Sequence, residues 1–401
     1  MQKENKNHNF INGTILLFSY MFIISDILFS NITLFFEIDI NNLFALLLVL
    51  FWVIGMYVER SYIYMSKIHI VFLILLTYYI STILWSVSIE SSIFQIIVFS
   101  YLFLVFLVIY DVYDNEGKIL YGVFSVTISS LVMVWTVLIG YFLHTFIGFD
   151  QSWWMVNDPS TPISWHFPSV TPETTGVTIS IGMICAWYLY NNPPSSVVKY
   201  TSISHLALSP FALVLVASRQ GFAAFSIVCL YIVLTVIVER KAGLKDTAKK
   251  IGYVSLPVLV SFIFVAPAVA VERVIRFDPG SFGGRMGVWE RIVSAIIERP
   301  LTGHGIGTQS FFLTDVSEET THNTYMALVV ETGILGLLLY MIIIVQSIRM
   351  CVYNLTERNL MWIMIILVWG ITGLFHERSA MGLLWFSIAM VLAEAKNEGP
   401  L

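Results

Sequence analysis

The chain has 401 residues, of which 57% are hydrophobic and 12% are charged, and its formal net charge is −5. Soluble domains contain about 25% charged residues, so this chain carries about half the usual charge. A soluble fold of this composition would leave apolar surface in water, and we expect no nucleic-acid partner. The aromatic content of 15% suits two interfacial belts of Trp and Tyr. The composition therefore predicts a protein that is embedded in a lipid bilayer throughout.

Hydrophobic stretches of membrane-spanning length recur along the chain. A spanning helix needs about 20 consecutive, mostly apolar residues. The stretches that meet or approach this length are 11–29, 42–58, 68–86, 92–110, 119–143, 175–190, 203–217, 220–238, 251–271, 323–346, 360–375 and 381–394. We therefore predict an all-α, polytopic transmembrane helical bundle of about 12 helices, folded as a single integral membrane domain over residues 1–401.

The distribution of basic residues orients this bundle. With the N-terminus in the cytoplasm, 14 of the 21 lysines and arginines fall on the cytoplasmic side, as the positive-inside rule favours. Both termini are then cytoplasmic, and residues 144–174 and 272–322 form long outer loops. The outer basic residues are all arginines: Arg219, Arg273, Arg276, Arg285, Arg291, Arg299 and Arg378. Arginine is suited to bidentate binding of phosphate oxygens, so either an anionic ligand on the outer face or ordinary loop composition explains the pattern.

The larger outer loop contains a helical pattern over residues 286–298. Two glycines precede the pattern and Pro300 ends it. Its apolar face consists of Trp289, Ile292, Val293, Ile296 and Ile297. We expect this amphipathic helix to lie along the membrane surface, with its Trp at the level of the lipid headgroups.

A run of glycines, Gly303-His304-Gly305-Ile306-Gly307, comes next. It follows no strand, which excludes a dinucleotide-binding turn and leaves two alternatives, a tight turn or a phosphate-binding turn. The loop ends with His322 and Asn323 at the start of the next apolar helix, where a histidine can exchange protons with solvent or substrate. Within that helix, Gly333 and Gly336 should let a neighbouring helix approach closely.

Three stretches with this spacing resemble the O-antigen ligase and O-antigen polymerase superfamily of bacterial envelope glycosyltransferases. The first is Ser218-Arg219-Gln220-Gly221, at a turn between two helices. The second is Gly284-Arg285, with Trp289 four residues later and Arg299-Pro300-Leu301-Thr302-Gly303-His304-Gly305 beyond it. The third is His322-Asn323, followed after nine residues by Gly333-Ile334-Leu335-Gly336. The resemblance covers about 210–345 in detail and the rest of the chain only by hydropathy.

The resemblance implies a GT-C-like fold and an inverting, metal-independent glycosyltransferase of the bacterial inner membrane. Such enzymes take a glycan from undecaprenyl diphosphate at the outer face and pass it to a glycan or a lipid-linked acceptor. Arg219 and Arg285 match by position the arginines that hold the diphosphate. His322 matches the catalytic histidine that activates the acceptor hydroxyl. No cofactor is implied.

The chemistry of such a reaction calls for the same residue types. Negative charge grows on the diphosphate as the glycosidic bond breaks, so fixed arginines or a divalent metal must stabilise it. The outer loops contain no DxD-like acidic pair, which favours the arginines. A sugar hydroxyl is a poor nucleophile and needs a base such as neutral histidine. Further possible site residues are Trp289, His304, Asn323, His376, Glu377 and Arg378.

Two other ionisable residues are expected outside the diphosphate site and the base. Arg299 lies 14 residues after Arg285, about 21 Å along a continuous helix, so the two are not expected to share one diphosphate. Glu331 lies nine residues after His322, about 13 Å deeper and on the opposite face of the helix. We therefore expect Glu331 to have a structural partner on another helix.

A lipid-linked glycan flippase or other polysaccharide transporter is the alternative function. A transporter should show ionisable residues through the bilayer midplane and discontinuous helices in matching halves of the chain. Here the ionisable residues gather at the outer rim, and no internal repeat is visible. Ligation of a finished glycan and polymerisation of repeat units use the same donor chemistry, so the sequence leaves both open.

Overall fold

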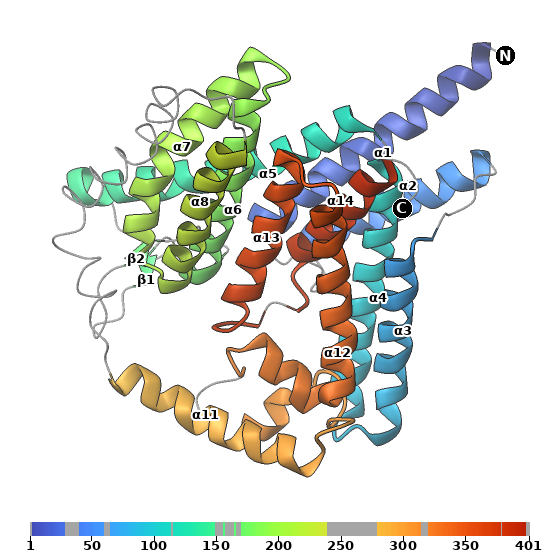
Figure 1. Ribbon diagram of the computed structural model, residues 1–401, viewed down its shortest axis with the longest axis vertical. Helices are drawn as coiled ribbons and strands as arrows, with labels where there is room; N and C mark the ends of the chain where they lie inside the picture. Colours follow the sequence, from blue (N-terminus) through green and yellow to red (C-terminus); the bar gives the residue numbers. More distant parts are fainter. Residues whose placement is uncertain are drawn as a thin grey trace. The chain divides into compact units, whose positions relative to one another are not determined.

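The computed structural model describes residues 2–28, 40–59, 65–113, 115–148, 155–156, 164–165, 170–238, 279–313, 320–377 and 379–397. Its helices (Figure 1) are α1 (Gln2–Leu28), α2 (Ile40–Glu59), α3 (Lys67–Ser81), α4 (Ile89–Val112), α5 (Glu116–Phe142), α6 (Pro172–Asn191), α7 (Ser196–Val216), α8 (Arg219–Val238), α11 (Pro279–Glu298), α12 (Thr324–Tyr353), α13 (Glu357–Thr372) and α14 (Gly382–Asn397). Short helical turns are η2 (Thr82–Trp85), η3 (Leu143–Ile147) and η4 (Gln309–Leu313). The strands β1 (Met155–Val156) and β2 (Ser164–Trp165) pair antiparallel.

The all-α prediction is confirmed for the described residues, apart from the β1–β2 ribbon, whose two-residue strands are too short for a hydropathy pattern to reveal. The predicted stretches fall on helices, except 251–271, which lies outside the described residues. Among the described residues, six helical segments are long and apolar enough to cross a membrane: 40–58, 67–85, 89–112, 116–147, 196–216 and 324–353. The count of about 12 spans stays a prediction, because α13 and α14 have only 16 residues each.

Polar caps set where several of these helices begin. Ser88 accepts a backbone N–H at the start of α4, and Asn115 accepts that of Lys118 at 3.0 Å at the start of α5. Helix α6 starts with Thr171 as its cap and Pro172 at its first position, where the missing proline N–H would have no helical partner. These polar capping residues separate one apolar run from the next. Hydropathy alone therefore shows where the helices lie.

The helices divide into two compact units, and the first comprises residues 1–51, 115–277 and 355–368. Within it, α6 packs against α5, α7 and α8 and is buried along nearly its whole length. Gly176 of α6 and Gly221 of α8 lie so close that a Cβ built on Gly176 would be 2.9 Å from the Gly221 Cα. The lack of both side chains lets these two helices touch.

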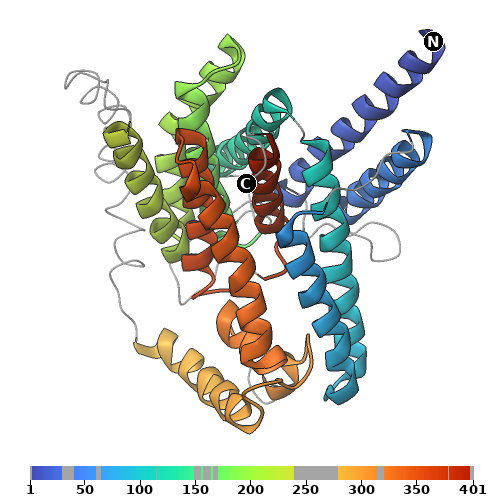
Figure 2. The same cartoon turned by 45° about the vertical axis from the view of Figure 1, so that its right-hand side comes forward.

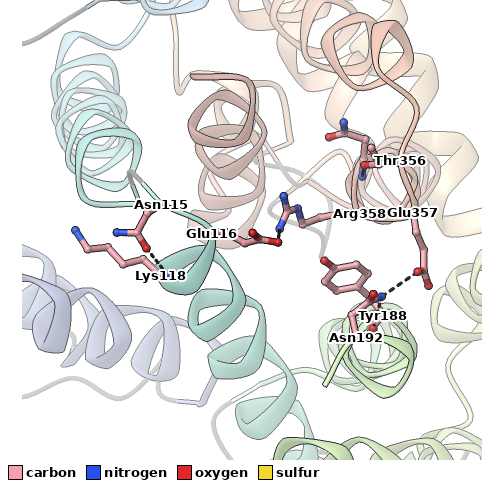
Figure 3. Close-up of polar contacts among 9 residues, drawn as sticks. Asn115, Glu116, Lys118, Tyr188, Asn192, Thr356, Glu357 and Arg358 are labelled. Atoms are coloured by element: carbon pink, nitrogen blue, oxygen red, sulfur yellow. Dashed lines mark hydrogen bonds and ion pairs between the residues drawn. The ribbon is translucent and has the colours of Figure 1, made fainter. Parts of the chain in front are cut away.

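A polar cluster joins helix ends within the first unit (Figure 3). The Glu357 carboxylate accepts a hydrogen bond from the side-chain amide of Asn192 at 2.9 Å. It accepts another from the side-chain amide of Asn191 at 3.0 Å. Arg358 forms an ion pair with Glu116 at 3.2 Å. The predicted topology puts these ends of α5, α6 and α13 together on the cytoplasmic side, so the contacts agree with that topology.

The second unit comprises residues 52–114, 278–354 and 369–401. Within it, α3 lies beside α4, α12 packs against α3, and α14 packs against α4 (Figure 1, Figure 2). Trp385 of α14 stacks on Phe72 of α3, with ring centroids 4.3 Å apart. Buried aromatic stacking of this kind adds to the packing energy of the apolar surface, and it fixes the helices that carry the rest of this unit.

A break in α12 is the central feature of the second unit. Gly333 has φ 65° and ψ −174°, which interrupts the helix. The backbone groups that a break frees must find partners inside a membrane protein. The turn after α11 supplies them through backbone N–H to C=O bonds: His304 to Val330 at 2.9 Å, Gly305 to Glu331 at 2.8 Å, Ile334 to Pro300 at 2.9 Å and Leu335 to Leu301 at 3.4 Å. The break is thus filled by the protein's own backbone.

We expected Gly333 and Gly336 to admit a neighbouring helix. Gly333 instead admits the backbone of the turn, since a Cβ there would lie 2.2 Å from the Leu301 carbonyl. Gly336 borders α3 as expected, because a Cβ there would lie 3.4 Å from the Tyr78 ring. The Tyr78 hydroxyl donates to the Thr332 carbonyl at 2.8 Å, so α3 also provides a hydrogen-bond partner for a carbonyl group at the break.

We predict that Gly333→Ala prevents the second unit from folding. The added methyl group would meet the Leu301 backbone, and a left-handed φ costs a non-glycine residue about 1–2 kcal/mol even without that clash. Gly287→Ala in α11 is the control, because nothing lies within 4 Å of a Cβ there. Yields of monodisperse protein after detergent extraction and size-exclusion chromatography measure the effect. Equal yields for the two variants would contradict the prediction.

The predicted topology is tested by cysteine labelling. On a background without Cys185, Cys229 and Cys351, we expect Ser310→Cys to react with an impermeant maleimide in spheroplasts and Ser196→Cys to react only after permeabilisation. Both serines are exposed, so reactivity reports the side of the membrane. The orientation is wrong if Ser196→Cys reacts from outside and Ser310→Cys does not.

Candidate functional site

The turn formed by residues 299–307 is fixed on two sides within the second unit. One side bonds to the broken helix α12, as described above. On the other side, the Ser92 hydroxyl of α4 donates to the Ile306 carbonyl at 2.7 Å. Gly305 has φ 109°, and a Cβ there would lie 2.5 Å from the Ser86 hydroxyl oxygen. Glycine is therefore required where the turn passes between α4 and α12.

The backbone amides of this turn have partners within the protein. Those of His304 and Gly305 donate to carbonyls of α12, and that of Gly307 bonds to the Glu331 carboxyl group. Amides that bind a phosphate would have to point at the ligand instead. Of the two alternatives that the sequence left open, the contacts favour the tight turn.

His304 lies inside this packing. Its ring is 2% exposed, its Nε2 lies 2.8 Å from the Ala295 carbonyl oxygen, and its edge meets the Phe312 ring at 4.7 Å between centroids. The ring thus joins α11 to η4. These contacts give His304 a role in holding the turn, and we leave it out of the substrate-binding set proposed below.

Helix α11 begins earlier than the predicted helix and buries a different stripe. Val288, Ile292 and Ala295 form its buried face, and they pack with residues of η4 and α12. Val293 and Ile297 of the predicted apolar face are 45% and 71% exposed within the protein. We expect that face to lie on the membrane surface, and this placement stays a prediction.

The two arginines at either end of α11 are well separated. Arg285 lies in the first part of the helix, and Arg299 follows its last residue. The Arg299 guanidinium Nη1 donates to the Trp85 carbonyl at 3.0 Å. Arg299 therefore has a partner in the second unit, which agrees with the choice of Arg285 over Arg299 for the diphosphate.

His322 occupies a strained position at the start of α12. Its φ is 50°, in the left-handed region. On one side the Trp289 indole donates to the Thr321 carbonyl at 3.1 Å. On the other, the Asn323 side-chain oxygen accepts the backbone N–H groups of Tyr325 and Met326, both at 3.0 Å. Asn323 is thus the N-cap of α12, and His322 is held between two fixed residues.

The connection between α13 and α14 lies against this histidine. The His322 and His376 rings have centroids 5.7 Å apart. The Thr324 hydroxyl donates to the His376 carbonyl at 2.8 Å, and the Asn323 side-chain amide donates to the Leu374 carbonyl at 3.1 Å. Four predicted residues, His322, Asn323, His376 and Glu377, therefore lie on contacting segments of the second unit, and Arg378 lies outside the described residues.

The carboxylates of this region share a partner that the sequence analysis did not identify. The Gln309 backbone N–H donates to Glu331 Oε1 at 3.3 Å, and its side-chain amide donates to Glu377 Oε2 at 3.1 Å. We expected the partner of Glu331 to lie on another helix, and it lies in the turn and in η4. An uncharged glutamine in a polar loop carries no pattern in the sequence, so only the fold reveals Gln309.

Arg219 belongs to the first unit. Ala217, with φ 49°, ends α7, and the Ser218 hydroxyl accepts the Gly221 N–H at 3.2 Å at the start of α8. Gly221 is pressed against α6, so the backbone on either side of Arg219 is anchored. Arg219 itself is exposed at the first position of α8, where a guanidinium can reach a ligand.

Among the described residues, no group of three or more His, Cys, Asp or Glu side chains is arranged to hold a metal ion.

Residues 205–341 match the family model described as O-antigen ligase. This match supports membership in the O-antigen ligase family. It confirms the resemblance over about the same segment that the three sequence stretches had indicated. No curated protein matches the chain. The family match and the apolar helices together support a multi-pass inner-membrane enzyme of the ligase or polymerase type, with lipid-linked glycans as its substrates.

The matched segment holds most of the candidate residues. It includes Arg219, Arg285, the turn 299–307 and His322. The connection with His376 and Glu377 lies beyond the matched segment, so its place in the site rests on its contacts with the start of α12.

Proposed function

We propose that the protein is an inverting, metal-independent glycosyltransferase that moves a glycan from undecaprenyl diphosphate to an acceptor hydroxyl on a glycan or a lipid-linked molecule. The observation that carries this proposal is the family match, whose segment contains both the arginine turn at 218–221 and the histidine at the start of α12. The transfer joins the acceptor oxygen to the anomeric carbon and releases the lipid diphosphate.

In the proposed reaction, Arg219 and Arg285 bind the diphosphate. As the bond from the anomeric carbon to the diphosphate oxygen breaks, its electron pair stays on the leaving group. Guanidinium groups form paired hydrogen bonds to phosphate oxygens and keep their charge at any physiological pH. They therefore stabilise the leaving group more in the transition state than in the bound donor, which lowers the barrier to transfer.

His322 is the proposed general base. The acceptor hydroxyl attacks the anomeric carbon from the side opposite to the diphosphate, and its proton passes to a nitrogen of the imidazole. The histidine is held in a left-handed conformation between Thr321 and Asn323. A base fixed in this way loses little freedom when it reaches the transition state, which favours catalysis. His376 lies beside it and forms part of the same surface.

The proposed site faces the outer side of the membrane, and both termini are cytoplasmic. The distribution of basic residues supports this orientation, and the contacts within each unit join segments that it puts on the same side. The α4 start meets the turn 299–307, and the α12 start meets the connection at 373–377. A site at the outer face would receive a lipid-linked donor from the bilayer and an acceptor from the aqueous side.

We predict that His322→Asn abolishes transfer without unfolding the protein. Asparagine tolerates the left-handed conformation better than alanine does, so the turn should persist while the base is lost. The loss should be at least about a hundredfold, the lower end of general-base catalysis. Transfer from purified undecaprenyl-diphosphate glycan in proteoliposomes measures it, with His144→Asn in η3 as the matched control. Full activity of His322→Asn together with loss in His376→Asn would move the base to His376.

We predict that Arg219→Lys reduces transfer strongly while insertion and yield stay normal. Lysine keeps the charge but cannot make the paired hydrogen bonds of a guanidinium. Arg291→Lys on the exposed side of α11 is the control. Activity should also survive treatment with EDTA. An enzyme that stops on chelation and recovers with magnesium would contradict the arginine-only account of the diphosphate site.

A further inference from the structure

Gln309, the first residue of η4, connects three segments of the second unit. Its side-chain nitrogen donates to Glu377 Oε2 at 3.1 Å, and its side-chain oxygen accepts the Thr321 backbone N–H at 3.2 Å. Its own backbone N–H donates to Glu331 Oε1 at 3.3 Å. Only one orientation of the amide satisfies both ends, because a flipped amide would put oxygen against a carboxylate and nitrogen against an N–H group.

The bond to Thr321 acts on the residue next to the proposed base. Thr321 also bonds to the residue that follows His322, since its hydroxyl donates to the Asn323 carbonyl at 3.0 Å. The Trp289 indole also donates to the Thr321 carbonyl. Thr321 is therefore held at its N–H, its side chain and its C=O. These contacts stabilise the left-handed φ of His322. Gln309 provides the contact at the Thr321 N–H.

The bond to Glu377 acts on the segment that carries His376. One carboxylate oxygen of Glu377 accepts the Ser379 hydroxyl at 2.5 Å, and the other accepts the Gln309 side-chain amide. Glu377 directly follows His376, whose ring centroid lies 5.7 Å from that of His322. A fixed Glu377 therefore helps to fix the segment that lies against the proposed base.

We propose that Gln309 is a positioning residue for the transfer reaction, which holds the turn of His322 and the carboxylate of Glu377 in one arrangement. This inference rests on the proposed function. Among the described residues, the titratable groups around Gln309 and its two carboxylates are Glu331 and Tyr340 of α12, Tyr79 of α3, Glu377 of the α13–α14 connection and, across Phe312, His304. Gln309 does not touch the reacting atoms; it acts through His322 and Glu377.

The sharpest test is Gln309→Glu, which keeps the size of the side chain and replaces its donor by an oxygen. Two carboxylates in contact cannot both ionise freely, so near neutral pH they repel unless they share a proton. We expect kcat to fall about tenfold or more, as for a displaced catalytic group, with little change in the donor KM.

The pH profile separates this role from a merely structural one. Lowering the pH supplies the shared proton, and the protonated carboxyl group can donate as the amide did. The activity of Gln309→Glu relative to the natural protein should therefore rise as the pH falls and decrease as the pH rises. Gln346→Glu near the C-terminal end of α12 is the matched control, because Gln346 is exposed and no described contact joins it to Glu331 or Glu377, so it should show a flat ratio.

Gln309→Met provides a second, uncharged variant. It removes both side-chain bonds, so we expect the same loss of kcat but a ratio that does not depend on pH. If both variants keep the natural kcat per folded molecule, or lose activity only in proportion to folded protein on size-exclusion chromatography, the positioning role is wrong. His322→Asn, assayed in parallel, distinguishes the two levels: an active His322→Asn overturns the proposed function itself, whereas an inactive His322→Asn beside a normal Gln309→Glu overturns only the inference about Gln309.

Discussion

The pairing of the 300–305 backbone with the interrupted helix α12 is the constraint on which the second unit depends. A break in an apolar helix frees carbonyl and N–H groups that cannot be left without partners in a membrane protein. Here the partners come from the turn after α11, through bonds on both sides of Gly333. Because glycine removes the side chains that would separate the two backbones, the turn and the helix form one rigid element.

The candidate site is built outward from this element. The turn carries Gly307 and leads into η4, so the Glu331 carboxylate below the break is bonded by amides from both. Gln309 also forms hydrogen bonds with Glu377 and with Thr321, which precedes the proposed base. A short chain of hydrogen bonds thus links a buried carboxylate to a histidine that its helix alone would place out of reach. Charged and polar groups of this kind are stable in an apolar setting only when each is paired.

A discontinuous helix is also a feature of transporters, where the freed backbone groups face a substrate or an ion. In α12 the freed backbone groups bond to the turn after α11. The described contacts therefore give this break a role in packing and in positioning the turn. The proposed base, His322, lies just before the first segment of α12, which ends at the break at Gly333. The backbone of that segment is bonded to the turn at Val330 and Glu331.

The sequence by itself determined the helical class, the apolar segments and the family resemblance, and it singled out Arg219, Arg285 and His322 as the positions proposed for chemistry. Each of these depends on composition, period or fixed spacing along the chain. Apolar runs bounded by Ser88, Asn115 and Thr171 locate helices without any knowledge of their neighbours. Only the tertiary structure decided that Gly333 ends one helical segment, that α11 packs Val288 and Ala295 against α12 and η4, and that Gln309 joins two carboxylates. These features depend on which helix surfaces pack together. Residues as far apart in the chain as 309 and 377 belong to no sequence pattern from which their contact could be predicted.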